Sequence, residues 1–266
     1  MTKKKIGIIQ SRGLGDIVIA LPIAWEYKLQ GYEVYWPICR EFIPSFANTA
    51  PWVNWISVPT DGQGKFFYTT PLKLLKEVGI EDQDDILFLY QYLSSTPELT
   101  NPDYFAMMKF DQYKYAVADV PFGKKWDLTT CIKRDPIREQ QLYDQLVKQD
   151  RYMVYQEQSS DVSYSMDLSA VDPAIQKIEI TKLTDNIFDW LKVIQGAELI
   201  VLIDSVFANL IDQLKICENV EKYFMRKWNR RVDGNPVLLG SWSYIPVQPP
   251  EGVKVQSLTD VVGTTK

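Results

Sequence analysis

Glycines and a carboxylate follow the first apolar run of the chain. The segment Ser11-Arg12-Gly13-Leu14-Gly15-Asp16 separates this run from a helical pattern. Glycine lets a backbone approach a ligand closely, a helix start favours anions, and a carboxylate there can take a proton from a hydroxyl. Gly13 and Gly15 could equally serve only to turn the chain, with Asp16 as a helix cap. A GxG without a third glycine is a weak signal for dinucleotide binding.

A second polar pair, Asp204-Ser205, lies far along the chain. It follows AELIVLI (197–203), where an unbroken apolar run predicts a buried strand with helices on both faces. Both side chains can hydrogen-bond a ribose or a phosphate, and the start of the following helix favours a diphosphate. A pair of helix-capping residues is the structural alternative.

Strands alternate with helices along the chain, which predicts parallel sheets. Strands are expected at 4–10, 32–36, 55–58, 85–90, 151–156, 177–180, 197–203, 236–240 and 253–256, and helices from Asp16, around 40–48, near 72–79, 102–116 and 136–148, from Thr184, and after Asp204-Ser205. Ligands in such folds bind beyond the carboxyl ends of strands, where both polar segments lie. The turn-rich segment 120–136 marks a junction, so we predict two domains, 1–130 and 131–266.

The composition excludes several classes of chemistry. The chain has no histidine, which removes the usual general base, the Ser-His and Cys-His nucleophiles and the commonest metal ligand. The three cysteines lie far apart, and no DxD-like carboxylate cluster argues for a metal. A net charge of -5 gives no general attraction to nucleic acid or anionic membranes. The first apolar run is too short for a signal or a membrane span, so we expect a cytoplasmic protein without integral membrane association.

Two segments together resemble the heptosyltransferases that use ADP-heptose to build lipopolysaccharide. RGLGDIVIALPIA (12–24) looks like the N-terminal signature of that family: a basic residue, a small loop, Gly-Asp, an aliphatic stretch and a proline. LTDNIFDWLKVIQGAELIVLIDSVFANLIDQLKI (183–216) resembles its C-terminal signature, in which a strand ends in Asp-Ser before a helix. Their order and separation also agree. The resemblance implies a GT-B-like α/β fold, with two Rossmann-like domains whose parallel sheets face each other across a cleft.

The resemblance also implies a glycosyltransferase that moves a sugar from a nucleotide-diphosphate sugar to an acceptor hydroxyl. Asp16 then corresponds to the catalytic base. The acceptor-side loop consists of Arg12, Gly13 and Gly15. The donor-binding residues are Asp204, Ser205 and Asn209. Val206 and Asn209 stand where the family has a Gly and a His, and segment 156–165 lacks the family's lysine, so the donor's base and sugar stay open. Direct displacement predicts inversion at the sugar, with no metal and no permanently bound cofactor.

The acceptor stays open between a saccharide or glycan of lipopolysaccharide type and DNA. The densest basic stretch, 225–231, contains a tryptophan and four cations, Arg226, Lys227, Arg230 and Arg231. Such a patch suits a polyanion, although a solvated helix end has the same composition. A compact viral enzyme that glycosylates 5-hydroxymethylated pyrimidine in DNA is therefore the second interpretation.

A noncatalytic Rossmann-like module that binds a nucleotide or a protein partner is the third interpretation, and the missing His and Lys favour it. A NAD-dependent oxidoreductase fits less well, because the strand at 32–36 does not end in an acidic residue that could hold a ribose. Cys39 or Cys217 as a nucleophile has no histidine to activate it.

Overall fold

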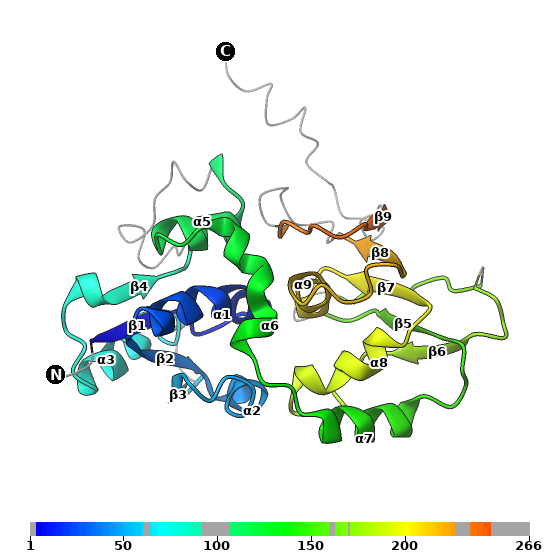
Figure 1. The fold of residues 1–266 in the computed structure, drawn as a ribbon, viewed down its shortest axis with the longest axis horizontal. Helices are drawn as coiled ribbons and strands as arrows, with labels where there is room; N and C mark the ends of the chain where they lie inside the picture. Colours follow the sequence, from blue (N-terminus) through cyan, green and yellow to red (C-terminus); the bar gives the residue numbers. More distant parts are fainter. Residues whose placement is uncertain are drawn as a thin grey trace, which may run out of the picture.

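Two parallel sheets stand side by side, each covered by helices (Figure 1). The computed structural model describes residues 4–60, 64–91, 107–159, 163–169, 171–226 and 235–245. We call the part from β1 to α6 the first half and the part from α7 onward the second half. None of the helices in the described ranges combines the length and the apolar character that a bilayer crossing requires.

The first half holds a four-stranded sheet in the order β3-β2-β1-β4. Its strands are β1 (Lys5–Ile9), β2 (Glu33–Cys39), β3 (Asn54–Val58) and β4 (Ile86–Phe88). Its helical elements are α1 (Leu14–Leu29), η1 (Arg40–Phe42), α2 (Ile43–Phe46), α3 (Thr69–Glu77), η2 (Gln83–Asp85), α5 (Phe110–Val117), η4 (Phe122–Asp127) and α6 (Leu128–Cys131). The aliphatic run of α1, Ile17–Ala24, is buried in the core, as expected for a helix packed on a sheet.

The second half holds a five-stranded sheet in the order β6-β5-β7-β8-β9. Its strands are β5 (Tyr152–Gln156), β6 (Gln176–Glu179), β7 (Leu199–Ile203), β8 (Glu221–Met225) and β9 (Ser243–Ile245). Its helical elements are α7 (Pro136–Leu146), η5 (Ile187–Trp190), α8 (Leu191–Gln195) and α9 (Val206–Gln213). All pairings within both sheets are parallel, which confirms the predicted α/β class.

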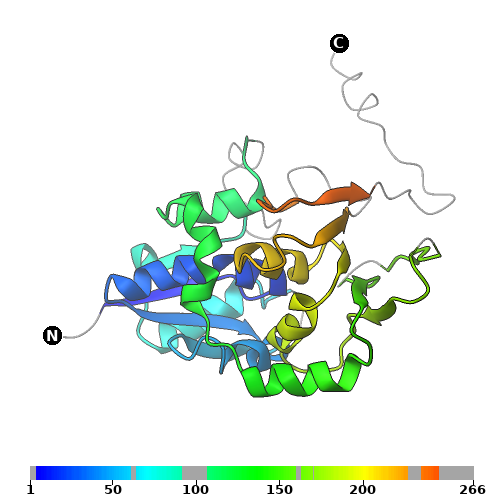
Figure 2. The same cartoon turned by 45° about the vertical axis from the view of Figure 1, so that its right-hand side comes forward.

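The two halves meet where α1 packs against α9 (Figure 2). The side chain of Gln213, on α9, is fully buried there and donates from Nε2 to the main-chain oxygens of Val18, at 3.4 Å, and Lys125, at 3.0 Å. Gly15 lies so close to α9 that a Cβ atom on it would be 3.6 Å from the Cα of Val206. The first turns of both helices are therefore held at the boundary between the halves.

Several element predictions need correction. The segment 236–240 forms no strand, because its main-chain amides bond to carboxylates instead of to a neighbouring strand: Val237 N donates to Asp111, and Leu239 N and Gly240 N donate to Asp212. The helix expected to begin at Thr184 begins later, because Asn186 caps η5 by accepting a hydrogen bond from Phe188 N. Strands β8 and β9 were not predicted from the sequence. The expected strand at 253–256 and the start of the expected 102–116 helix lie outside the described residues.

Asp212 joins the C-terminal segment to the contact between the halves. Its buried carboxylate accepts hydrogen bonds from Trp126 Nε1 at 2.9 Å and from the amides of Leu239 and Gly240 at 2.7 Å each. Trp126 belongs to the first half, whereas 239–240 follow β8, so one side chain connects three separate stretches of chain.

We expect Asp212→Ala to lower the free energy of unfolding by about 3 kcal/mol, because it leaves several buried N–H donors without an acceptor. Urea unfolding followed by tryptophan fluorescence measures this loss. The control is Asp144→Ala on α7, whose carboxylate is exposed and, among the described residues, accepts from Gln140 alone, so its effect should stay within about 0.5 kcal/mol. Equal losses in the two variants would contradict the assigned role of Asp212.

Candidate functional site

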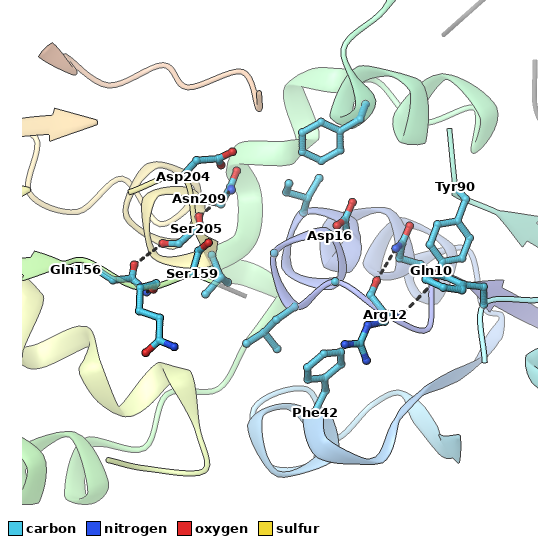
Figure 3. Close-up of a pocket in the computed structure, with 18 residues that line it drawn as sticks. Gln10, Arg12, Asp16, Phe42, Tyr90, Gln156, Ser159, Asp204, Ser205 and Asn209 are labelled. Atoms are coloured by element: carbon cyan, nitrogen blue, oxygen red, sulfur yellow. Dashed lines mark hydrogen bonds between the residues drawn. The ribbon is translucent and has the colours of Figure 1, made fainter. Parts of the chain in front are cut away.

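A cavity of about 640 Å³ opens between the carboxyl ends of β1 and β7 (Figure 3). Both halves contribute to its lining, which consists of Gln10, Arg12, Gly13, Leu14, Gly15, Asp16, Ile19, Phe42, Phe67, Tyr90, Phe110, Gln156, Gln158, Ser159, Asp204, Ser205, Val206 and Asn209. Residues 12–16 and 204–205, from the two segments singled out in the sequence, thus face one cavity although they lie far apart along the chain.

The topology explains why the cavity forms at this place. In the first sheet the chain leaves β1 toward β2 on one side and returns to β4 on the other, and in the second sheet β5 is flanked in the same way by β6 and β7. Loops diverge at such switch points and leave a crevice beyond the strand ends. The loop after β1 and Tyr90 after β4 line one side of the crevice, and Gln156 at the end of β5 and Asp204 after β7 line the other.

Asp16 occupies the first turn of α1 and is held by two different contacts. One carboxylate oxygen, Oδ1, lies 3.0 Å from Nζ of Lys114, whose side chain is 2% exposed, whereas the side chain of Asp16 is 34% exposed. The other oxygen, Oδ2, lies over Gly13, where a Cβ atom would come within 2.4 Å of it. Gly13 also has φ of +84°, a conformation that favours glycine. Gly13 therefore turns the chain and leaves room for the carboxylate.

The loop between β1 and α1 is fixed by Tyr90. The hydroxyl of Tyr90 accepts hydrogen bonds from the amides of Ser11, at 3.0 Å, and Arg12, at 3.1 Å. Burial raises the pKa of Tyr90 well above its ordinary value, so the ring stays neutral over the physiological range. The Arg12 guanidinium pairs with Glu41 at 3.2 Å and lies 5.3 Å from the centre of the Phe66 ring. Arg12 is thus positioned by the first half alone.

On the opposite side, Ser205 joins α9 to β5. Its hydroxyl accepts a hydrogen bond from Phe207 N at 3.3 Å, which makes Ser205 the N-cap of α9, and donates to Gln156 Oε1 at 2.6 Å. The Asn209 side chain lies one turn further along α9, and its Nδ2 donates to Ser205 O at 3.4 Å. Asp204 and Asn209 are both at least nine-tenths buried. This side of the cavity therefore presents a capped helix start with amide and carboxylate side chains around it.

The two helix starts differ in their caps. Gly13 precedes α1 and offers no side chain to its first amides, whereas the Ser205 hydroxyl already bonds one amide of α9. The first amides of a helix have no partners within the helix and carry its partial positive charge. Both ends can therefore interact with an anionic group that enters the cavity.

The structure places seven predicted site residues around this one cavity: Asp16, Arg12, Gly13, Gly15, Asp204, Ser205 and Asn209. Their roles in binding and catalysis stay predictions. Of the expected polyanion patch, Arg226 does not line the cavity, and Lys227, Arg230 and Arg231 lie outside the described residues. Within the described ranges, no group of three or more Cys, Asp or Glu side chains could hold a metal ion.

Three important side chains were missed in the sequence. Lys114 pairs with Asp16, Gln10 accepts from Lys114, and Gln156 accepts from Ser205. Gln10 and Gln156 could have been found, because each is a polar residue at the carboxyl end of a predicted parallel strand. Lys114 gives no such signal, because only the folded chain brings α5 next to the start of α1.

Comparison with known proteins gives a likeness in structure only. No protein-family model and no curated protein sequence matches the chain. A crystal structure of a glycosyl transferase family 9 protein from Veillonella parvula matches 99% of this chain and 91% of its own, with a TM-score of 0.58 and 11% identity. The dodecameric iron-containing heptosyltransferase TibC of E. coli, in complex with ADP-D-beta-D-heptose, matches 94% of this chain and 64% of its own, with a TM-score of 0.51 and 10% identity. Together with the two parallel sheets, this likeness confirms the predicted GT-B-like fold.

We expect Gly13→Ala to destabilise the protein more than Gly31→Ala. Both glycines have positive φ, of 84° and 93°, so each substitution should cost about 1 kcal/mol of backbone strain. Only at Gly13 does the new methyl group also displace a carboxylate, because nothing lies within 4 Å of a Cβ atom at Gly31. The excess at Gly13, measured by chemical unfolding, should shrink when Asp16 is replaced by Ala, which removes the carboxylate and keeps only the Cβ atom at 3.3 Å. An excess that is unchanged in that background would contradict the assigned contact.

Proposed function

We propose that the chain is a glycosyltransferase that moves a sugar from a nucleoside-diphosphate sugar to an acceptor hydroxyl. The observation that supports this most directly is the convergence of a one-third exposed carboxylate, Asp16, and the capped start of α9 on opposite sides of one cavity. Such a transfer needs a base for the acceptor and a cationic or hydrogen-bonding environment for the departing diphosphate. The GT-B-like fold is compatible with this chemistry, and the residues named here would carry it out. We also propose the division into an acceptor-side domain, 1–130, and a donor-side domain, 131–266.

Asp16 acts as the general base in this proposal. Its carboxylate takes the proton of the acceptor hydroxyl while the oxygen attacks the anomeric carbon and the bond from that carbon to the diphosphate breaks. A single in-line displacement of this kind inverts the configuration at the sugar. Because the chain has no histidine, a carboxylate at the cavity is the natural candidate for this proton transfer.

The start of α9 receives the negative charge that develops on the diphosphate. The N–H groups of the first turn point toward the N-terminus of α9, which lies at the cavity. Preorganised donors of this type can each lower a reaction barrier by about 3 kcal/mol. The carboxylate of Asp204 on this side is better suited to hydroxyl groups of the donor than to its phosphates, because like charges repel. Asp204 and Asn209 therefore bind donor hydroxyls, and the helix start binds the diphosphate.

The acceptor is a saccharide in this proposal. Phe42, Phe67 and Phe110 come from three separate stretches of the chain and line the cavity that also contains Asp16. Aromatic rings pack well against the apolar face of a sugar ring and leave its hydroxyls free for hydrogen bonding. The only cation that lines the cavity within the described ranges is Arg12, and Glu41 already pairs with it.

We expect Asp16→Asn to lower sugar transfer about 100-fold or more, because it removes the base and preserves the shape of the side chain. The measurement is release of nucleoside diphosphate from a panel of UDP-, GDP-, ADP-, CDP- and dTDP-sugars, with neutral glycosides and hydroxymethylcytosine-containing DNA as acceptors. Donor affinity, measured by calorimetry, should change little. Asp144→Asn, on an exposed face of α7, is the control and should behave as wild type.

The outcomes of this assay separate the interpretations. Release that depends on a glycoside supports a saccharide acceptor, and release that depends on the DNA would replace it with a DNA acceptor. Donor binding without release in the wild-type protein would make the chain a nucleotide-binding module. Release by Asp16→Asn at the wild-type rate would remove Asp16 from the role of base.

We expect Ser205→Ala to weaken donor binding about fivefold, because the α9 cap and the anchor of Gln156 are lost together. Ser205→Thr keeps a hydroxyl at this position and should bind the donor within about twofold of wild type. Calorimetric titration with the best donor of the panel measures both values. Unchanged affinity in Ser205→Ala would show that the diphosphate binds elsewhere, for which the uncapped start of α1 is the alternative.

A further inference from the structure

We propose that Lys114 is a positioning residue, which fixes Oδ1 of Asp16 and leaves Oδ2 as the atom that takes the proton of the acceptor. This inference rests on the proposed function, because Asp16 is the base only there. Lys114 does not line the cavity, so its effect on the reaction would pass through Asp16. Figure 3 shows Asp16 on α1, across the cavity from Asp204 and Asn209.

The ammonium group of Lys114 has three polar partners inside the protein: two hydrogen-bond acceptors and one carboxylate with which it forms an ion pair. A lysine carries three N–H donors and no acceptor. Nζ lies 2.6 Å from Gln10 Oε1, 3.0 Å from Leu89 O and 3.0 Å from Asp16 Oδ1. Two of these partners sit at the ends of adjacent strands β1 and β4, so the sheet itself fixes the position of Nζ. The carboxylate of Asp16 is then oriented by a group that cannot move with it.

The two oxygens of Asp16 are made unequal by this arrangement. Oδ1 faces the buried ammonium group, and Oδ2 lies over the bare Cα atom of Gly13. Lys114 is almost fully buried and the side chain of Asp16 is one-third exposed, so in this proposal the acceptor reaches the carboxylate from the side opposite Lys114. A proton delivered from the cavity therefore reaches Oδ2. Misplacement of a reacting group by about 1 Å can lower a rate about 100-fold, which gives the expected size of the effect.

A second buried lysine provides a matched control. Lys125 Nζ lies 2.7 Å from Asp111 Oδ2, and both side chains are fully buried. Burial lowers the pKa of Lys125, and its ammonium also donates to Val237 O. The pair resembles Lys114 and Asp16 in chemistry, but neither of its members lines the cavity. Loss of Lys125 should lower stability without acting on the reacting atoms.

The test is a double-mutant cycle on sugar transfer with Lys114→Met, Asp16→Asn and the combined variant. We expect Lys114→Met to lower kcat about 10-fold to 100-fold and to leave the donor KM within about twofold, because the base is misplaced but the donor site is intact. In the Asp16→Asn background the same substitution should change kcat by less than about twofold. Lys125→Met should leave kcat within about threefold at a temperature where the variant is folded.

Circular dichroism shows whether Lys114→Met folds. If it does not, Lys114→Arg, which keeps the positive charge, supplies a second double-mutant cycle with Asp16→Asn. It should lower kcat less than Lys114→Met, and its effect should also vanish in the Asp16→Asn background. Additive losses in both cycles, or an equal loss of kcat in Lys125→Met, would overturn the positioning role and leave the proposed function standing. Wild-type transfer by Asp16→Asn would remove Asp16 from the role of base and overturn the positioning role with it, whereas absence of transfer in the wild-type protein would overturn the proposed function.

Discussion

The packing of α1 against α9 is the contact on which the site depends. Each helix follows a central strand of its own sheet, and their first turns are brought together by Gly15 and Val206 and by the buried side chain of Gln213. A bulky side chain at Gly15 would press on the backbone of α9 and move the two helix starts apart. The cavity that contains Asp16 and Asp204 exists because two helix ends, from opposite halves of the chain, share this boundary.

Three buried charged side chains near the contact between α1 and α9, those of Asp111, Lys125 and Asp212, have hydrogen-bond partners inside the protein. Asp212 and Asp111 accept main-chain amides of the 237–240 segment, and Lys125 donates to Asp111 and to the same segment. A buried carboxylate is tolerated when several donors surround it. Residues 237–240 are thus held by hydrogen bonds from their amides to side-chain carboxylates, and not by pairing with a neighbouring strand. This arrangement attaches the C-terminal segment to the first half, and none of these residues lines the cavity.

The sequence predicted the fold class, most of the strands and the two loops of the site, because glycine spacing, apolar runs and helix caps are local signals. It failed where contacts between distant residues decide the structure. The segment 236–240 looks like a strand, but the carboxylates that bind its amides are more than 20 residues away in sequence. Strand β8 looks too polar in sequence to be a buried strand. Its Lys222 is nevertheless buried, because Nζ donates to main-chain oxygens of the preceding turn, a contact that the sequence does not reveal. Lys114 could not be linked to Asp16 before the fold was known.

Protein partners orient the polar groups that line the cavity. Asp16 is paired with Lys114, Arg12 with Glu41, and the Ser205 hydroxyl with Gln156, so each of these groups has a fixed orientation. A site of this kind spends little free energy on reorganisation during reaction, since its dipoles already point to where charge will develop. The conformational entropy of these side chains is already lost on folding, because the strand ends and helix starts hold them in place. Stability of the contact between α1 and α9 and precision at the cavity are therefore consequences of the same packing.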